Sequence, residues 1–245
     1  MIPKIIHYCW FGSKEMPKLA KKCLASWKKY CPDYEIKCWN ESNFDINSNQ
    51  YVKEAYENKK YAFVTDCVRL YALYNYGGIY MDTDVEVIKN MDAFLECKGF
   101  FGFESDDTIS TAIIASEKKM PIFNELIEYY KNRNFVNKDG TFDTTPNTKV
   151  ITKIFTNYGL NPNNKMQNVK DFTFYESEYF SPIDCRTRVK KVTSNTCVIH
   201  WFSGSWLPLK EKVKLKIYEL MGKTIGESGT NKIINLLKGK KNAKK

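Results

Sequence analysis

The stretch Tyr71-Ala-Leu-Tyr-Asn-Tyr-Gly-Gly-Ile-Tyr-Met-Asp-Thr-Asp-Val85 contains the strongest structural signal in this chain. We predict that it holds the end of a helix, a break at Gly77-Gly78, and a short apolar strand that runs into Asp82-Thr83-Asp84. Because side chains alternate along a strand, Tyr80, Asp82 and Asp84 would then project from the same face.

Two neighbouring carboxylates at a strand end indicate a site for a divalent metal ion. Two such anions repel each other and raise each other's pKa unless a cation lies between them. Oxygen ligands on a rigid element suit Mg²⁺ or Mn²⁺, which complete their coordination with substrate phosphates and water. A solvated turn also produces an Asp-x-Asp pair, but the preceding Gly-Gly, the apolar strand and a helix with Asp66 and Arg69 favour a metal that binds a diphosphate.

Length and composition are those of one folded domain. The chain has 245 residues, of which 43% are hydrophobic and 15% aromatic, enough for a sizeable core. No apolar run is long enough to cross a bilayer, and no export signal follows Met1. We therefore expect a cytoplasmic protein whose eight cysteines are reduced.

The net charge of +10 raises the alternative of a basic nucleic-acid-binding protein. Only four arginines occur, although arginine side chains make most base-specific contacts. Half of the excess charge lies in the last eight residues, 238–245. The sequence also contains no nucleic-acid-binding motif, so we predict no nucleic-acid partner.

Strands alternate with helices along the chain, which predicts an α/β fold with a mixed, mainly parallel sheet. The expected strands are Ile2–Trp10, Tyr34–Trp39, Ile79–Met81, Val85–Ile88, Gly99–Glu104, Thr108–Ser116, Phe172–Tyr175 and Thr196–Trp201. The expected helices are Pro17–Tyr30, Tyr51–Lys59, Tyr61–Tyr76, Pro121–Asn132, Thr148–Tyr158, Val213–Met221 and Asn231–Leu237. We expect residues 1–210 to form the catalytic domain, and residues 211–245 to form amphipathic helices with a basic tail.

Ligands of open α/β sheets bind beyond the carboxyl ends of the strands. Trp10 and the pair Asp82 and Asp84 all lie at such ends, so we expect them to meet in one crevice.

Four segments together resemble glycosyltransferase family 32, the sugar-binding region containing the DXD motif, in its bacterial capsular and cell-surface polysaccharide type. The segments are Ile2–Gly12, Ala62–Leu70, Tyr76–Asp84 and His200–Trp206. The likeness covers the first hundred residues well and residues 105–195 only loosely. It implies a GT-A-like domain, a nucleotide-sugar donor, Mn²⁺ dependence and retention of anomeric configuration.

The resemblance also implies roles for the metal-side residues. Asp84 would bind the metal directly, and Asp82 would contact the metal through water or the ribose. His200 or a serine hydroxyl, with Ser205 as the candidate, would complete the coordination, and Trp206 would close over the leaving diphosphate. A core histidine followed by an aromatic turn is an equally good interpretation of this last segment.

Further roles concern the donor sugar and the nucleotide. Asp66 and Arg69 lie three residues apart on one helix face, where they form either a surface ion pair or a functional pair. In the functional interpretation Asp66 accepts hydrogen bonds from sugar hydroxyls and Arg69 neutralises phosphate charge. Asn147 would contact the sugar near its anomeric carbon.

Two aromatic side chains are candidates for nucleotide contacts. Trp10 would stack on the base, and Tyr80 would hydrogen-bond the diphosphate, although both also fit a hydrophobic core. His7 fits best as a structural histidine.

The predicted function is metal-dependent, retaining transfer of a hexose from a nucleoside-diphosphate sugar, with UDP-hexose preferred, to a lipid-linked precursor of a surface or capsular polysaccharide. A toxin-like protein glycosyltransferase is an alternative that would share every donor-site residue. The apolar stretch Ile233–Leu237 beside many lysines predicts either peripheral contact with an anionic membrane or a solvated tail.

Overall fold

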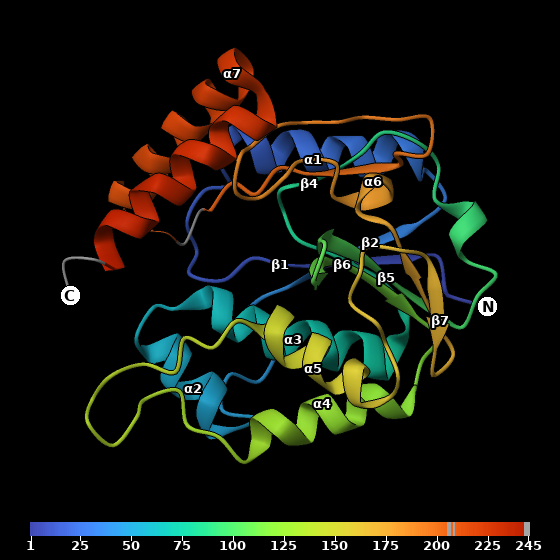
Figure 1. The fold of residues 1–245 in the computed structure, drawn as a ribbon. Coiled ribbons are helices and arrows are strands. Elements are labelled where there is room, and N and C mark those ends of the chain that lie inside the picture. Colours follow the sequence, from blue (N-terminus) through green and yellow to red (C-terminus); the bar gives the residue numbers. More distant parts are fainter. Residues whose placement is uncertain (205–206, 208, 243–245) are drawn as a thin grey trace.

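The computed structural model describes residues 1–204, 207 and 209–242, with side chains to residue 237. A seven-stranded sheet forms the centre, and helices cover both of its faces (Figure 1). Helix α1 (Lys18–Tyr30) lies on one face, and the other face carries α2 (Gln50–Glu57), α3 (Tyr61–Tyr76), α4 (Pro121–Lys131) and α5 (Asn147–Asn157).

The sheet has the strand order β2-β1-β3-β6-β5-β8-β7. The strands are β1 (Ile5–Cys9), β2 (Glu35–Trp39), β3 (Gly78–Met81), β5 (Gly99–Ser105), β6 (Thr108–Ser116), β7 (Gln167–Val169) and β8 (Phe172–Tyr175). β6 and β7 run against the other five strands, as the parallel and antiparallel pairings require. The predicted α/β class with a mixed, mainly parallel sheet is therefore confirmed.

Each face of the sheet has its own hydrophobic core. The core under α2, α3, α4 and α5 contains fully buried aromatic side chains such as Phe101, Phe123 and Phe155. The opposite core holds Trp27 of α1, whose indole Nε1 donates a hydrogen bond to the carbonyl oxygen of Val85 at 2.8 Å. That bond ties α1 to the segment directly after Asp84.

Gly77 and Gly78 are required where α3 turns into β3. Both have left-handed backbone conformations, with φ of 67° and 96°. A Cβ atom on Gly77 would lie 2.7 Å from the amide nitrogen of Lys118, and one on Gly78 would lie 2.6 Å from the carbonyl oxygen of Ile5. The break was predicted from the sequence, and the structure shows that it lets β3 lie directly beside β1.

The prediction that the strand continues through Asp84 is wrong. β3 ends at Met81, and residues 82–84 form a turn closed by a hydrogen bond of 3.0 Å from the Val85 amide to the Asp82 carbonyl oxygen. The chain then enters β4 (Val85–Val87), which pairs with β9 (Val198–His200) in a separate two-stranded sheet. A turn therefore directs the two acids, in place of strand alternation.

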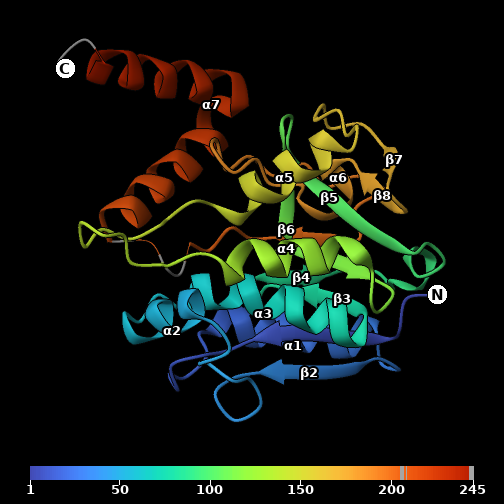
Figure 2. The same cartoon turned by 90° about the horizontal axis from the view of Figure 1, so that it is seen from below.

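The C-terminal part contains the two predicted helices, both longer than expected. Together they form α7 (Leu209–Asn242), whose two helical arms meet at a kink at Gly226, where φ is 67°. Figure 2 shows the bend between its two arms. The short elements η1 (Asp92–Phe94), β7 and α6 (Ser177–Phe180) were not predicted, because segments of three or four residues have no measurable periodicity.

All eight cysteines are free thiols. Across the described part of the chain, none of the helices is both long and apolar enough to cross a bilayer.

Candidate functional site

Three potential metal ligands meet beyond the end of β3. Asp82, Asp84 and His200 each offer one ligand atom, and these atoms lie within 4.8 Å of one another. The antiparallel pairing of Val85 with His200 brings the histidine to the acids from 116 positions further along the chain. Nε2 of His200 lies 3.6 Å from Oδ1 of Asp84. The predicted metal residues are thus together in space.

The chemistry of this cluster fits a divalent cation. Burial raises the pKa of Asp82, with Arg69 opposing that shift and Asp84 adding to it. His200 is mostly buried, and its Nδ1 has no hydrogen-bond partner among the described residues. Two carboxylates and one imidazole form a donor set that suits Mn²⁺ better than Mg²⁺.

Backbone groups fix Asp84 in place. The amide of Ser203 donates to its Oδ2 at 2.7 Å, and the amide of Trp201 donates to its carbonyl oxygen at 3.0 Å. The guanidinium of Arg188 in turn donates to the Trp201 carbonyl oxygen at 2.7 Å. The segment that follows β9 therefore closes one side of the acidic cluster. Ser205 and Trp206, which come next, lie outside the described residues.

A second network joins Asp66, Arg69 and Asn147. Oδ1 of Asp66 accepts hydrogen bonds from Nη2 of Arg69 at 2.9 Å and from Nδ2 of Asn147 at 2.6 Å. Oδ1 of Asn147 accepts a hydrogen bond from the Thr111 hydroxyl at 3.0 Å. The side chain of Arg69 is only 5% exposed, so this is a buried network and not the surface ion pair of the alternative interpretation.

Arg69 connects the two networks. Its Nη2 lies 3.5 Å from Oδ1 of Asp82, and its Nη1 donates to the Thr111 carbonyl oxygen. Burial lowers the pKa of Arg69, but Asp82, Tyr80 and Asp66 outweigh that effect and keep the guanidinium charged. Burial also raises the pKa of the Asp66 carboxyl to about 7, although Arg69 acts in the opposite direction.

Tyr80 belongs to the same network. Its hydroxyl donates to Oδ1 of Asp82 at 2.8 Å, and the guanidinium carbon of Arg69 lies 4.6 Å from its ring centre. The side chain is buried, so its contacts are with the protein, as the core alternative expected.

Trp10 lies directly after β1, beside β3. Register pairs His7 with Tyr80, so Cys9 comes level with Asp82 two residues later. Burial raises the pKa of the Cys9 thiol, and the charges of Arg69 and Asp82 both act on it. The half-buried indole of Trp10 donates from Nε1 to the Lys14 carbonyl oxygen at 2.6 Å. The first strand therefore ends next to the acidic cluster, as predicted.

His7 is a structural histidine, as predicted. Its Nε2 lies 2.8 Å from the Gly77 carbonyl oxygen, and its Nδ1 accepts a hydrogen bond from the Trp39 indole at 3.2 Å. Burial lowers its pKa to about 4, so the ring is neutral at physiological pH.

Glu104 is a site residue that the sequence reasoning missed. Burial raises its pKa to about 8, with a further contribution from Asp82, while Arg69 and a hydrogen bond with Ser110 lower it. It lies near the end of β5, which runs in the same direction as β3. Its place at the end of a predicted strand was the available signal, but the direction of that strand relative to β3, which the structure shows, is needed to bring it to the sheet edge of Asp82.

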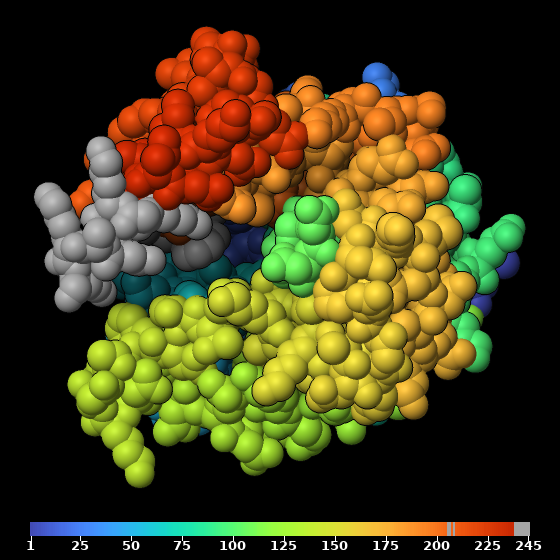
Figure 3. Space-filling view, viewed as in Figure 1, coloured from blue at the N-terminus to red at the C-terminus, as the bar shows by residue number. Residues whose placement is uncertain are grey.

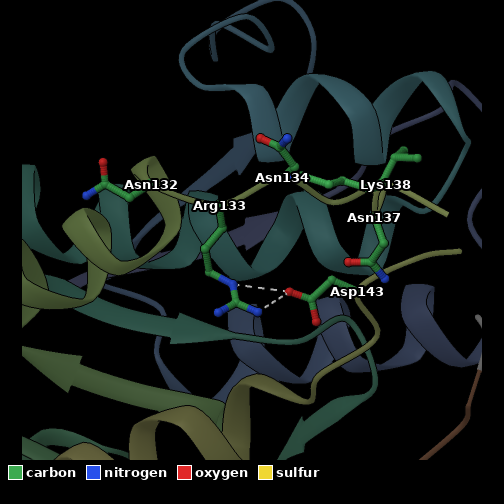
Figure 4. Close-up of a pocket in the computed structure, with 7 residues that line it drawn as sticks. Asn132, Arg133, Asn134, Asn137, Lys138 and Asp143 are labelled. Atoms are coloured by element: carbon green, nitrogen blue, oxygen red, sulfur yellow. Dashed lines mark hydrogen bonds and ion pairs between the residues drawn. The ribbon is translucent and has the colours of Figure 1, made fainter. Parts of the chain in front are cut away.

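The surface of the protein has two hollows. Figure 3 shows a hollow between α7 and the yellow-green segment before α5, with the green β5–β6 turn at its rim. A second, open depression contains none of the cluster residues (Figure 4). It is lined by Asn132, Arg133, Asn134, Val136, Asn137, Lys138 and Asp143. There Arg133 forms a two-pronged ion pair with Asp143, whose Oδ2 lies 3.1 Å from the arginine Nε.

Comparison with known proteins agrees with this geometry. Residues 17–100 match the family model "Glycosyltransferase sugar-binding region containing DXD motif". An uncharacterised glycosyltransferase of Acanthamoeba polyphaga mimivirus is 27% identical over 85% of this chain and 85% of its own length. Inositol phosphoceramide mannosyltransferase 3 of Schizosaccharomyces pombe is 29% identical over 51% of this chain, which spans only 36% of that protein.

A solved structure titled "PaToxG Glycosyltransferase" covers 64% of this chain and 72% of its own, with 22% identity and a TM-score of 0.47. The relatives found are viral, fungal and plant proteins, so the bacterial capsular type implied by the resemblance has no support among them. The family model over residues 17–100 and the named glycosyltransferases among the relatives support the assignment of this chain as a glycosyltransferase.

Proposed function

We propose that this protein transfers a hexose from a nucleoside-diphosphate sugar to a saccharide or glycolipid acceptor, with a divalent metal holding the diphosphate. The single observation that carries the proposal is the convergence of Asp82, Asp84 and His200, with Arg69 3.5 Å from Asp82. A cation at that position, preferably Mn²⁺, would neutralise the negative charge that develops on the departing diphosphate.

The protein residues would have distinct tasks. Asp84 would bind the metal directly, while Asp82 would contact the metal through water or the ribose. Arg69 is enclosed by Asp66, Asp82 and Thr111, which favours a role in positioning the carboxylates and balancing their charge over direct phosphate contact.

Asp66 and Asn147 are proposed to contact the donor sugar. Nδ2 of Asn147 donates a hydrogen bond to Oδ1 of Asp66 at 2.6 Å. The side-chain oxygens keep further lone pairs that can accept hydrogen bonds from sugar hydroxyls. Trp10 would stack on the base from the end of β1, and Tyr80 would hold Asp82 in position by its hydrogen bond. Ser205 and Trp206 are proposed to reach the diphosphate.

The identity of the sugar is a choice between two donor classes. UDP-hexose follows from the family resemblance, whereas two of the fungal relatives are named mannosyltransferases. Two of those relatives are named for inositol phosphoceramide, a lipid, which agrees with the lipid-linked acceptor expected from the sequence. We propose retention of anomeric configuration and a cytoplasmic, peripherally membrane-bound protein. A toxin-like transfer to a protein acceptor would use the same donor residues.

A panel of UDP-glucose, UDP-galactose, UDP-N-acetylglucosamine and GDP-mannose tests the proposal. We expect hydrolysis of one donor with Mn²⁺, and a loss of at least about 100-fold in the Asp84→Asn variant, since removing one electrostatic contact to a transition state typically costs that much. Asp171→Asn is the matched control, because this exposed acid forms a surface ion pair with Lys98, 3.1 Å away, and is not one of the proposed ligands. The proposal fails if no donor is bound or hydrolysed in the presence or absence of metal.

A further inference from the structure

The first arm of α7 has two faces of different character. Leu215 and Gly222 face the body of the protein: a Cβ atom on Gly204 would meet Leu215 at 3.7 Å, and one on Gly222 would lie 2.6 Å from the Thr187 carbonyl oxygen. The opposite face carries four apolar residues, which we call the outer stripe: Leu209, Val213, Ile217 and Leu220. Their exposed fractions are 76%, 52%, 50% and 56%.

The outer stripe is continuous. Its spacing of four, four and three residues places all four side chains within an arc of about 80° on a helix that turns 100° per residue. Single apolar residues are often exposed on protein surfaces. A continuous stripe of four on one helix face instead indicates a surface that packs against another apolar surface.

Lysines border the outer stripe on both sides. Lys210 and Lys214 follow one edge, and Lys216 and Lys223 follow the other. The side chains of Lys214, Lys216 and Lys223 remain 49%, 67% and 68% exposed despite their ion pairs with Glu211 and Glu219. From Leu209 to Ile225, the first arm of α7, there are five lysines and two glutamates, a net charge of +3.

We propose that the outer stripe of α7 docks in the plane of an anionic lipid surface, with the four apolar side chains among the acyl chains and the bordering lysines at the headgroups. An apolar stripe between cationic edges is the pattern of an interfacial helix, and the positive charge complements anionic headgroups. This surface is separate from the basic tail and from Ile233–Leu237, on which the sequence-based expectation depended.

The position of α7 indicates what membrane contact would achieve. Only this part of the inference rests on the proposed function. α7 starts at Leu209, six residues after Ser203, whose amide holds Asp84. Docking would therefore bring the acidic cluster close to the bilayer in which a lipid-linked acceptor lies. The stripe and its lysine edges do not themselves depend on the reaction.

Flotation of the full chain with vesicles tests the docking surface. We expect binding to vesicles of phosphatidylcholine and phosphatidylglycerol, weak binding to phosphatidylcholine alone, and weaker binding as salt is raised. The double variant Val213→Glu/Ile217→Glu should lose at least about tenfold in partitioning, since two apolar anchors become anions. Met166→Glu is the matched control, because Met166 is 48% exposed and precedes β7, which lies far from α7 (Figure 1).

The outcomes separate this proposal from the proposed function. Donor hydrolysis in solution should be equal in the double variant and the wild type, so a chain that hydrolyses a donor but ignores anionic vesicles overturns the docking surface alone. Equal vesicle binding by the double variant and the wild type also overturns it. Light scattering tests the remaining alternative. If the wild type is a dimer, the double variant is a monomer and neither binds vesicles, the outer stripe is an interface with a second copy of the chain.

Discussion

The Asp66–Arg69–Asn147 network and the Asp82–Asp84–His200 cluster contain similar side chains that differ in exposure and in their hydrogen-bond partners. In the first, the Asp66 carboxylate accepts hydrogen bonds from Arg69 and Asn147, and the Asp66 and Arg69 side chains are 11% and 5% exposed. In the second, Asp82 is 30% exposed, Asp84 and His200 are separated by 3.6 Å, and the His200 Nδ1 lacks a partner among the described residues.

The first group is more deeply buried and pairs its acid with a cation, whereas the second gathers two acids and a histidine that a metal ion can bind together. We therefore expect mutations in the first group to change stability most, and mutations in the second to change metal binding most.

The largest expected effect is that of Arg69→Leu. It would leave the buried carboxyls of Asp66 and Asp82 without their cation, so the free energy of unfolding should fall by about 3–5 kcal/mol. Urea denaturation measures the loss. Arg133→Leu is the matched control, since that arginine is 36% exposed in its ion pair with Asp143, and it should cost about 1 kcal/mol or less. Equal losses in the two variants would contradict the larger cost expected for breaking the buried ion pairs of Arg69.

A smaller effect is expected from metal binding. Mn²⁺ at ten times its dissociation constant should stabilise the wild type by about 1.4 kcal/mol, because only the folded chain holds the three ligands together. Asp84→Asn should abolish this gain and be at least as stable as the wild type without metal, since it removes like-charge repulsion. Thermal unfolding with and without Mn²⁺ measures both. If Mn²⁺ stabilised the variant as much as the wild type, Asp84 would not be a ligand.

The smallest expected effect is a difference in pH dependence. The pKa of Asp66 is raised to about 7 by burial, against about 3.9 in an unfolded chain. Between these values the folded state binds more protons than the unfolded state, so this group makes stability fall as pH rises. Asp66→Asn should remove about 1 kcal/mol of that fall in stability in metal-free urea titrations between pH 6 and pH 7. If the stability of the variant fell more steeply with rising pH than that of the wild type, folding would lower the pKa of Asp66 and not raise it.

Local patterns in the sequence predicted most of the architecture. Residues 61–76 and 121–131 fold as helices within a residue of expectation, because long periodic segments bury one face in any compact fold. Gly77-Gly78 predicted the break before β3 for a reason the structure confirms, namely backbone contacts too close for a Cβ atom. The three metal-side residues that lie within the described chain also come together as predicted.

Other features depended on contacts between distant segments. The sequence alone determined the element types, the Gly-Gly break and the identity of the acids, because each is encoded in neighbouring residues. Only the tertiary structure decided that a turn, not a strand, directs Asp82 and Asp84, that β9 delivers His200, and that Glu104 lies near Asp82. The same is true of the orientation of α7, since helical periodicity identifies an apolar stripe but only packing decides which stripe remains exposed.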